Sequence, residues 1–358
     1  MDEIVEHART LIQKGSKSFA GAARLFAPEQ RDSAYMLYAW CRHCDDVIDG
    51  QELGHTPASA AVTTAYGTSG AQVAAPATGE PPPDARETPA ASAAAFAAAG
   101  PSAAEQQHAL EGLQCQTEQA LRGDAVDPVF IALSRVVDRH AIPHRHPFEL
   151  LEGFRMDVEG ARYTTIDDTL RYCYHVAGVV GVMMAMVMGV KARETLNRAS
   201  DLGLGFQLTN IARDVIPDAQ AGRVYLPAAW LEDVGVPATP EAVAAVENRE
   251  AVACVVRRLL DEAERYYESA RHGLPALDSR SAWAIASARH VYRDIGSLVR
   301  ERGSKAWDRR AVVSRMRKRI GVAVAGGLVA HSRIGRHLGI GTLPPREGLW
   351  TMPGLGDA

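Results

Sequence analysis

Apolar residues recur at intervals of three and four along almost the whole chain, and this helical period constrains its fold more than any other feature. No stretch of useful length alternates apolar and polar residues as a half-buried strand does. The sequence therefore predicts an all-α fold. The helices are expected over roughly 2–14, 17–26, 29–50, 105–122, 127–140, 147–158, 167–190, 192–216, 227–234, 240–273, 280–302 and 305–330.

One low-complexity segment interrupts the helical pattern. Residues 56–102 are largely Ala, Pro, Gly, Thr and Ser, a composition that cannot bury enough surface to offset the entropy of ordering. We predict a disordered insertion on an exposed loop within a single domain over residues 1–335. The tail at residues 340–358 has a similar composition, and we expect it to be flexible.

Charge and cysteine content narrow the expected partners and location. The formal net charge is −4, with Lys and Arg scattered along the chain, so we expect no nucleic-acid partner. Five cysteines and no signal peptide predict a reducing compartment, and hence a cytoplasmic protein. The longest uncharged apolar run, residues 176–190, is shorter than the roughly 20 residues of a membrane span. Peripheral membrane contact stays open, whereas a span is not expected.

Three aspartates gather in the stretch CRHCDDVID, residues 41–49. Asp45 and Asp49 are four residues apart and share one helical face, which Tyr38 and Arg42 extend upstream. Like charges at that spacing destabilise an isolated helix by roughly 0.2–0.5 kcal/mol, a cost that a bound divalent cation would reverse. For this pair taken alone, a solvated acidic helix end is the alternative interpretation.

A second polar stripe lies in GFQLTNIARDVIPDAQAGRVYLP, residues 205–227. Gln207, Asn210 and Asp214 fall on one helical face beside an apolar stripe. Pro217 lacks an amide hydrogen and disfavours helical geometry in the residue before it. We therefore expect a kink or a helix end between Asp214 and Asp218, and whether Asp218 continues the polar face depends on it.

The donor atoms on the two stripes are carboxylate and amide oxygens, with no His or Cys among them. Such hard donors suit Mg²⁺, with Mn²⁺ as a substitute, and magnesium often bridges carboxylates to phosphate oxygens. The substrate should then carry phosphate, which the nearby Arg42, Arg213 and Arg223 would neutralise. The predicted metal ligands are Asp45, Asp49, Asn210, Asp214 and Asp218.

Two other stretches fit a phosphorylated substrate with an apolar tail. In KGSKSF, residues 14–19, free amide groups and Lys17 precede a helical pattern and can meet an anion, although a plain N-cap is the simpler interpretation. The run 176–190 carries small residues at three- and four-residue spacing. These would leave a groove for a hydrocarbon tail, and close helix packing is the simpler explanation of the run alone.

Three motifs closely resemble those of the squalene/phytoene synthases: CRHCDDVID, RYCYHVAGVVG at residues 171–181, and FQLTNIARDV followed by GRVYLP at residues 206–227. The likeness runs from about residue 7 to residue 318, apart from the insertion. It implies the all-α isoprenoid-synthase fold of class I terpenoid synthases, with a central cavity. GSKSF and LYAWCRHCDDVID look most like the phytoene-forming bacterial members.

For those members the resemblance implies a magnesium-dependent, head-to-head condensation of two geranylgeranyl diphosphates. The reaction passes through a cyclopropylcarbinyl diphosphate, yields phytoene and two diphosphates, and is the first committed step of carotenoid biosynthesis. No NADPH is expected.

The resemblance also implies roles for single residues. Asp45, Asp49, Tyr172, Asp214 and Asp218 would be catalytic, with Tyr172 near the reacting carbons. Asp157, Arg162 and Tyr163 match the family as well and are predicted to support the site from behind. Positions that contact prenyl diphosphates in relatives are Gly15, Ser16, Lys17, Ser18, Tyr38, Arg42, Gln207, Arg213 and Tyr292. Arg223 completes the predicted substrate-binding set because of its place beside the second stripe.

Three alternatives stay open. Squalene or dehydrosqualene formation from farnesyl diphosphate is the nearest, although the small Gly15 and Ala23, where some thirty-carbon relatives are bulkier, favour the longer substrate. A chain-elongating prenyltransferase would share DDVID but lack the other two motifs. A non-catalytic helical relative acting as an assembly protein would have no need of the intact acids on both stripes. The sequence does not fix the oligomeric state.

Overall fold

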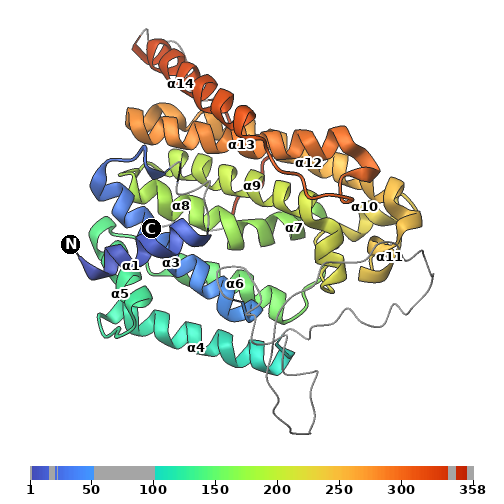
Figure 1. Ribbon diagram of the computed structural model, residues 1–358, viewed down its shortest axis with the longest axis horizontal. Coiled ribbons are helices and arrows are strands. Elements are labelled where there is room, and N and C mark those ends of the chain that lie inside the picture. The colour runs from blue at the N-terminus through green and yellow to red at the C-terminus, as the bar shows by residue number, and fades with distance from the viewer. Residues whose placement is uncertain (1, 16–20, 22, 52–100, 338–343, 353–358) are drawn as a thin grey trace, which may run out of the picture.

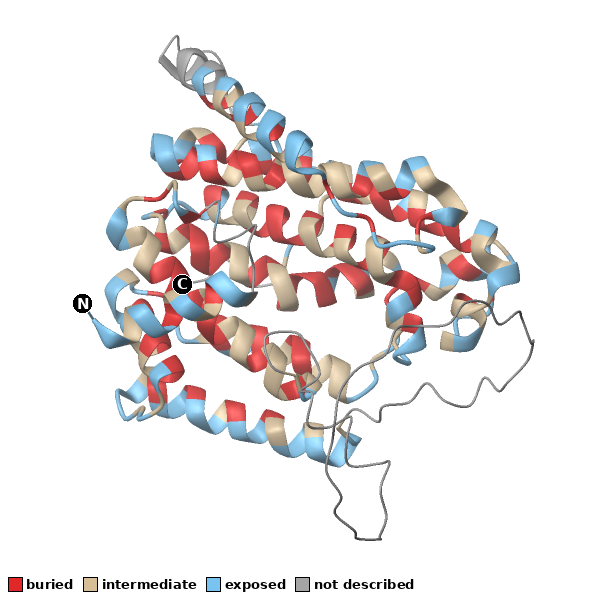
Figure 2. Cartoon of the chain, in the orientation of Figure 1, coloured by how far each residue is buried: buried red, intermediate tan, exposed pale blue. Residues whose placement is uncertain are grey.

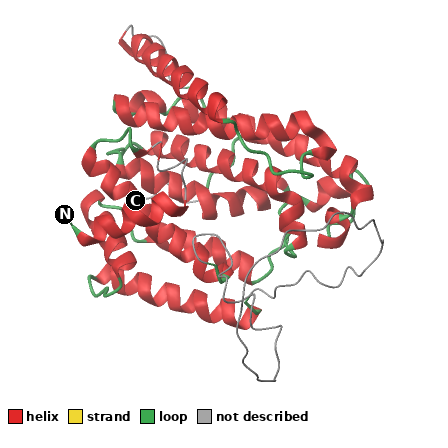
Figure 3. Cartoon of the chain, in the orientation of Figure 1, coloured by secondary structure: helices red, strands yellow, loops and turns green. Residues whose placement is uncertain are grey.

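The computed structural model describes residues 2–15, 21, 23–51, 101–337 and 344–352. Within these ranges every regular element is a helix, which confirms the all-α prediction (Figure 3). The α-helices are α1 (Glu3–Gly15), α3 (Pro28–Asp49), α4 (Ala103–Arg122), α5 (Pro128–His140), α6 (Arg145–Val158), α7 (Ile166–Cys173), α8 (Val179–Val187), α9 (Arg193–Gln220), α10 (Ala228–Glu232), α11 (Pro240–Ala244), α12 (Arg249–Arg271), α13 (Ser279–Arg302) and α14 (Arg315–His337). The short helical turns are the π-turn η1 (Tyr174–Gly178) and the 3₁₀ turns η2 (Val246–Asn248), η3 (Leu274–Ala276) and η4 (Gly303–Lys305).

Local chemistry sets the boundaries of the helices that carry the acidic stripe and its neighbour. Helix α3 has Pro28 in its first turn and ends at Gly50, whose φ of 61° is the left-handed conformation that glycine adopts without strain. Helix α4 starts after Ser102, which forms a reciprocal capping box with Glu105. The last two residues of the predicted insertion therefore belong to an ordered helix start. The insertion's residues 56–100 lie outside the described part of the chain.

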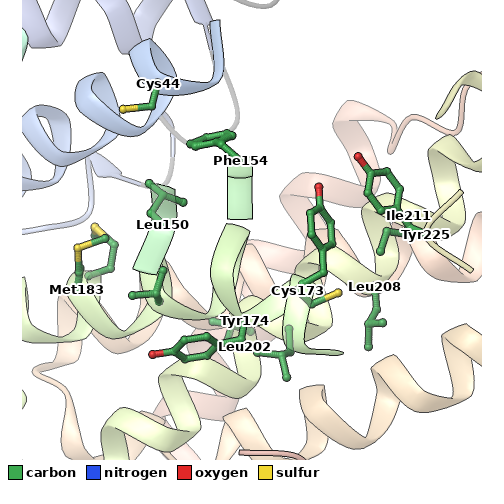
Figure 4. Packing of buried hydrophobic residues seen from close by; sticks show 14 of the residues in the cluster. Cys44, Leu150, Phe154, Cys173, Tyr174, Met183, Leu202, Leu208, Ile211 and Tyr225 are labelled. Carbon is green, nitrogen blue, oxygen red and sulfur yellow. The ribbon is translucent and has the colours of Figure 1, made fainter. Parts of the chain in front are cut away.

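Helix α9 runs through the middle of the molecule (Figure 1). It packs against α8 and η1 on one side and against α12 and α13 on the other, while α3 packs against α1 and α5. Buried side chains face this centre, and exposed ones cover the outer helices α4 and α14 (Figure 2). In Figure 4, Cys44, Leu150 and Phe154 gather with Met183 and Leu202, so that α3, α6, α8 and α9 share one core.

Glycines bring α9 unusually close to the segment formed by η1 and α8. A Cβ atom added at Gly203 would lie 2.3 Å from the carbonyl oxygen of Ala177, and one added at Gly181 would lie 2.4 Å from that of Ala199. No real side chain fits at such distances, so both positions require glycine. Gly181 therefore serves close helix packing, which is one of the two interpretations of the run 176–190.

Helix α9 differs from its prediction at Pro217. The expected kink or helix end between Asp214 and Asp218 is absent, because the helix continues to Gln220. Pro217 lies in the last turn, where its missing N–H costs a single hydrogen bond, and the buried Ile216 and Ala219 hold that turn against the core. Asp218 therefore follows Asp214 by one turn on a continuous helix.

Three other predicted helices differ from the structure. The predicted helix 17–26 lies partly outside the described residues, and its residues 24–26 form a turn and a bend. The predicted helix 305–330 begins at Arg315, because Ser314 accepts a hydrogen bond from the N–H of Arg317 as an N-cap does. The predicted helix 240–273 is divided into α11, η2 and α12, and the side chain of Asn248 donates to the carbonyl of Ala242 at the break.

Residues 344–352 differ from the expectation of a flexible tail. Arg346 forms an ion pair with Asp201 of α9, and the N–H of Trp350 donates to the hydroxyl of Tyr266 on α12 at 3.1 Å. The ring of Trp350 also contacts Tyr174, with ring centroids 5.9 Å apart. These contacts fix the segment along the outside of the helices. Residues 340–343 and 353–358 lie outside the described ranges.

Among the described residues, one helical stretch, Ile166–Val187, is long and apolar enough to cross a membrane by length and composition alone. Within its most apolar window, 67% is buried inside the protein. That burial is typical of a core helix, in keeping with the buried helix predicted for this run.

Candidate active site

A cavity of about 880 Å³ lies between α3, α8, α9 and α13 and joins the two predicted acidic helices. One part of its wall is polar and the other is apolar. The polar wall includes Tyr38, Arg42, Asp45, Asp49, Asp157, Tyr172, Gln207, Asn210, Arg223, Tyr225 and Tyr292, and Thr195, Arg198, Ser287 and Lys318 also line the cavity. The apolar wall includes Phe154, Val176, Ala177, Val180, Gly181, Met184, Ala185, Met188, Leu202, Gly203, Leu274 and Leu277.

The acidic face of α3 points into this cavity as the four-residue spacing predicts. Arg42 contacts Asp45 at 3.0 Å and donates from its Nε to Asp46 at 3.0 Å. Burial raises the pKa of Asp45 to about 6; Arg42 opposes the rise, and the neighbouring Asp49 and Asp46 add to it. The carboxylates of α3 therefore carry more negative charge than their own arginine neutralises.

Only part of the polar face of α9 lines the cavity. Gln207 and Asn210 line the cavity, and the Nδ2 of Asn210 donates to the Oε1 of Gln207 at 3.2 Å. Asp214 does not line it; its carboxylate accepts from the Nε of Arg213 at 2.9 and 3.0 Å and from Arg310 at 3.3 Å. Arg213, predicted to bind substrate, therefore faces Asp214 instead.

Asp218 lies one turn beyond Asp214 and is half-buried without lining the cavity. Burial raises its pKa to about 7, and the charge of Asp214 adds to the rise while Arg223 opposes it. Asp218 thus belongs to the same electrostatic cluster as the cavity acids.

Arg223 joins segments that are far apart in the sequence. Its Nη2 donates to the Oδ1 of Asp49 at 2.9 Å, across 174 residues. The carboxylates of Asp49 and Asp157 and the hydroxyl of Tyr225 favour its charged form and raise its pKa against the effect of burial. This one cation is therefore shared by acids from α3, α6 and α9, since Asp218 also feels it.

Asp157, at the end of α6, accepts hydrogen bonds from two tyrosine hydroxyls. The hydroxyl of Tyr172 donates to its Oδ2 at 2.9 Å, and that of Tyr225 donates to its Oδ1 at 2.8 Å. The two rings stack with centroids 4.6 Å apart and an interplanar angle of 18°. Burial raises the pKa of Tyr172 well above its usual value, so its hydroxyl stays protonated, and burial also raises the pKa of Asp157. The pair holds Tyr172 in one orientation in the cavity wall.

Sequence reasoning gave Asp157 a supporting position but missed Tyr225 as a site residue. Tyr225 stands inside the GRVYLP stretch that carries the family resemblance, and that was the available signal. Tyr292, predicted to contact a prenyl diphosphate, lines the cavity, and its ring stacks on that of Phe206 with centroids 4.0 Å apart. Ser16, Lys17 and Ser18 lie outside the described residues, and Gly15 is the last residue of α1.

The donor set fits a divalent cation that is shared with a substrate. Within the described ranges, no group of three or more His, Cys, Asp or Glu residues is arranged to hold an ion by protein atoms alone. Asp45, Asp49 and Asn210 nevertheless present hard oxygen donors to one cavity, and Asp45 shares the cation of Arg42 with Asp46. Magnesium is typically held by one or two carboxylates together with substrate phosphates and water, which matches such a partial set.

Comparison with known proteins agrees with this geometry. The family model for squalene/phytoene synthase matches residues 12–317. The chain is 45% identical to a 15-cis-phytoene synthase of Enterobacter agglomerans, covering 96% of this chain and 100% of the relative. It is also 45% identical to a 15-cis-phytoene synthase of Pantoea ananas, covering 98% of each chain.

Solved structures agree on the fold. The crystal structure of a dehydrosqualene synthase in complex with ligand matches with a TM-score of 0.71 at 25% identity, covering 92% of this chain and 97% of that one. A squalene synthase of Alicyclobacillus acidocaldarius matches in fold with a TM-score of 0.63 at 20% identity, covering 84% of this chain and 94% of that one.

Proposed function

Since the chain belongs to the squalene/phytoene synthase family of prenyltransferase-type enzymes, we propose that it condenses two geranylgeranyl diphosphates into phytoene. Family members act on prenyl diphosphates in the all-helical isoprenoid-synthase fold, generally with a divalent metal. The 45% identity to two proteins named 15-cis-phytoene synthase, over nearly their whole length, supports the phytoene-forming reaction.

The observation that carries the proposal is the composition of the cavity. Acids and Arg42 from α3, Asp157 from α6, two amides from α9 and Arg223 line one part of the cavity, and apolar residues from η1, α8 and α9 line another. A prenyl diphosphate has the same two parts, a charged head and a long hydrocarbon tail. A cavity of about 880 Å³ gives space for a molecule of that class, because small-molecule sites commonly measure 300–1,000 Å³.

We assign the cation to Asp45, Asp49 and Asn210, with Asp214 and Asp218 at the edge of the same cluster. The metal, Mg²⁺ with Mn²⁺ as a substitute, would supply charge stabilisation to a departing diphosphate. Arg42 and Arg223 line the cavity and add fixed positive charge near the same position. Both arginines are already oriented by carboxylates, so little reorganisation is needed as charge develops.

The reaction then requires two departures of diphosphate. In the first, the C1–O bond of one substrate breaks, the diphosphate leaves with the electron pair, and the double bond of the second substrate attacks C1. Loss of a proton closes the cyclopropane ring. In the second, the remaining diphosphate leaves, the carbocation rearranges, and loss of another proton gives the central triene of phytoene. No reductant enters this balance.

The apolar wall protects the carbocations from water. Tyr172 lines the cavity, with its hydroxyl donating to Asp157 and its ring stacked on Tyr225. An electron-rich aromatic ring held in this way can face a cation without reacting with it. We therefore assign Tyr172 to the stabilisation of the carbocations and Asp157 to the positioning of Tyr172.

The test is a product assay with purified full-length protein. Geranylgeranyl diphosphate and Mg²⁺ are supplied without reductant, and the lipid extract is analysed by mass spectrometry. A forty-carbon triene is the expected product, and removal of divalent cations with EDTA should abolish it. Farnesyl diphosphate, with and without NADPH, forms the second arm. A thirty-carbon product formed in preference to the forty-carbon one would replace this proposal with dehydrosqualene or squalene formation, and no product in either arm would contradict both.

A further inference from the structure

Helix α14 exposes large apolar side chains along one face. Met316, Ile320 and Val324 recur every four residues and are 66%, 53% and 53% exposed, and Val312, just before the helix, is 66% exposed. We term these four residues the α14 stripe. They make up half of the eight large apolar side chains that are exposed in the described residues, so the exposure is concentrated in one place.

The opposite face of α14 is fixed to α13. A Cβ atom at Gly321 would lie 2.3 Å from the ring of His290, and the Nε1 of Trp283 donates to the carbonyl of Val322 at 2.7 Å. Ala325 is only 2% exposed in the same interface. The helix therefore cannot rotate to bury its stripe, and it projects beyond the bundle with the stripe outward (Figures 1 and 2).

The segment around the stripe is strongly basic. Residues 303–337 contain nine Lys or Arg residues and a single acidic residue, Asp308, in a chain of net charge −4. Three of the nine, Arg315, Arg317 and Arg319, fall within five positions at the start of α14. Arg315, Arg317 and Arg319 are exposed around the stripe. Apolar and basic side chains on one helix fit a surface of anionic lipid.

The same helix forms part of the cavity wall. Lys318 and Val322 of α14 line the cavity, whereas the members of the stripe do not. If a hydrocarbon product leaves the cavity on the side of α14, it avoids water only when lipid covers that side of the protein. We propose that the α14 stripe and its flanking arginines dock this protein on an anionic membrane surface, where the product passes into lipid. The docking stands on the stripe and its charge alone, whereas the transfer of product also rests on the proposed function.

Flotation of the substrate-free, full-length protein with vesicles tests the docking. Vesicles of phosphatidylcholine with phosphatidylglycerol should bind the protein, and pure phosphatidylcholine vesicles or high salt should weaken binding. The triple variant Met316→Ser, Ile320→Ser, Val324→Ser should lose at least about tenfold in vesicle affinity, because three apolar side chains no longer enter the lipid. Arg315→Gln with Arg317→Gln and Arg319→Gln should lose the preference for anionic lipid.

A matched control variant carries Val126→Ser and Val246→Ser, since these side chains are 90% and 73% exposed elsewhere on the surface. It should bind vesicles as the parent does. The proposal is overturned if the stripe variant, folded by circular dichroism, binds as tightly as the parent. It is also overturned if vesicles bind neither protein while analytical ultracentrifugation shows that the stripe substitutions dissociate an oligomer, since the stripe would then join copies of this chain.

A second readout separates this inference from the proposed function. Vesicles should raise the steady-state turnover of the parent, and the stripe variant should lose this stimulation while keeping its single-turnover rate. If binding to vesicles is lost in the stripe variant but no product forms in any protein, the docking stands and the proposed function fails. If product forms but vesicles neither bind the parent nor stimulate it, the proposed function stands and the docking proposal fails.

Discussion

The buried Asp201 and the half-buried acids of the cavity differ in how their charge is balanced. Asp201 of α9 is 0% exposed, and its two oxygens accept from the Nε of Arg346 at 2.9 Å, from the Nη2 of the same guanidinium and from the hydroxyl of Ser269. Arg198 in turn donates to that hydroxyl at 2.6 Å. This carboxylate has all the partners it needs within the chain.

At the cavity, carboxylates share their cations. Arg42 contacts both Asp45 and Asp46 of α3, and Arg223, which pairs with Asp49, also opposes the rise that burial causes in the pKa of Asp157 and Asp218. Burial and mutual repulsion raise the pKa of Asp45 to about 6, whereas the arginines oppose that rise.

A buried charge is tolerable only when it is paired, and the difference lies in where the partner comes from. At Asp201 the partner is an arginine of the same chain. At the cavity acids, a bound cation would be a further partner. Substitutions on the two sides should therefore separate stability from activity.

The largest effect is expected from the cavity acids. Asp45→Asn or Asp49→Asn should lower the rate of product formation on the order of 10³-fold, because each removes a charged donor from the cluster that stabilises the leaving diphosphate. The measurement is kcat with geranylgeranyl diphosphate and Mg²⁺, together with the midpoint of thermal unfolding. Glu29→Gln on the same helix is the control, since this exposed carboxylate is outside the cavity. Full activity in one of these variants would show that the substituted acid is not part of the active site.

The opposite result is expected at the paired acid. Arg346→Gln should lower the free energy of unfolding by about 3 kcal/mol, because Asp201 then stays buried without its cation. Urea denaturation measures this loss, and kcat per folded molecule should match the parent. Arg122→Gln breaks an exposed pair with Glu118 and should cost less than about 1 kcal/mol. A drop in kcat at unchanged stability would show that the Asp201 pair serves the reaction instead.

Asp157 lies between these cases, because it is half-buried, accepts two hydrogen bonds and is part of the cavity wall. Asp157→Asn leaves one carbonyl oxygen for two tyrosine hydroxyls, so Tyr172 loses its fixed orientation. We expect kcat to fall by about 10- to 100-fold with little change in KM. Tyr225→Phe removes the second hydroxyl, keeps the ring stack and should have a smaller effect. An equal rise in KM for both variants would indicate a role in substrate binding.

The smallest effect concerns pH. The metal-free pKa values of Asp45 and Asp218, about 6 and about 7, lie above the usual 3.8. Between about pH 4 and pH 7 the folded state therefore binds more protons than the unfolded chain, and its stability falls as pH rises. Because a cation binds the carboxylates, Mg²⁺ should raise Tm by a few degrees more at about pH 8 than at about pH 5.5.

Scanning calorimetry with and without Mg²⁺ at each pH gives this comparison. Asp45→Asn should reduce both the fall in metal-free stability and the shift caused by Mg²⁺. A shift that is the same at both pH values would contradict the role of these carboxylates in holding the metal.

Much of this protein is determined by patterns within single segments. Helical period gave the all-α class, and the four-residue spacing of Asp45 and Asp49 put both side chains in the cavity wall. Gln207 and Asn210 reached the same wall for the same reason. A helix fixes the relative direction of residues three and four apart, so such predictions need no knowledge of the rest of the fold.

Tertiary structure decided what spacing cannot specify. The pairing of Asp49 with Arg223 across 174 residues, the two hydroxyls on Asp157 and the docking of Arg346 onto Asp201 each join separate segments. The direction of Asp214 toward Arg213 and Arg310 also depends on neighbouring segments rather than on its place in the stripe. The packing of the helices determines which partner a buried charge has. A buried charge without a counter-charge is unfavourable, and only the packing brings distant residues close enough to pair.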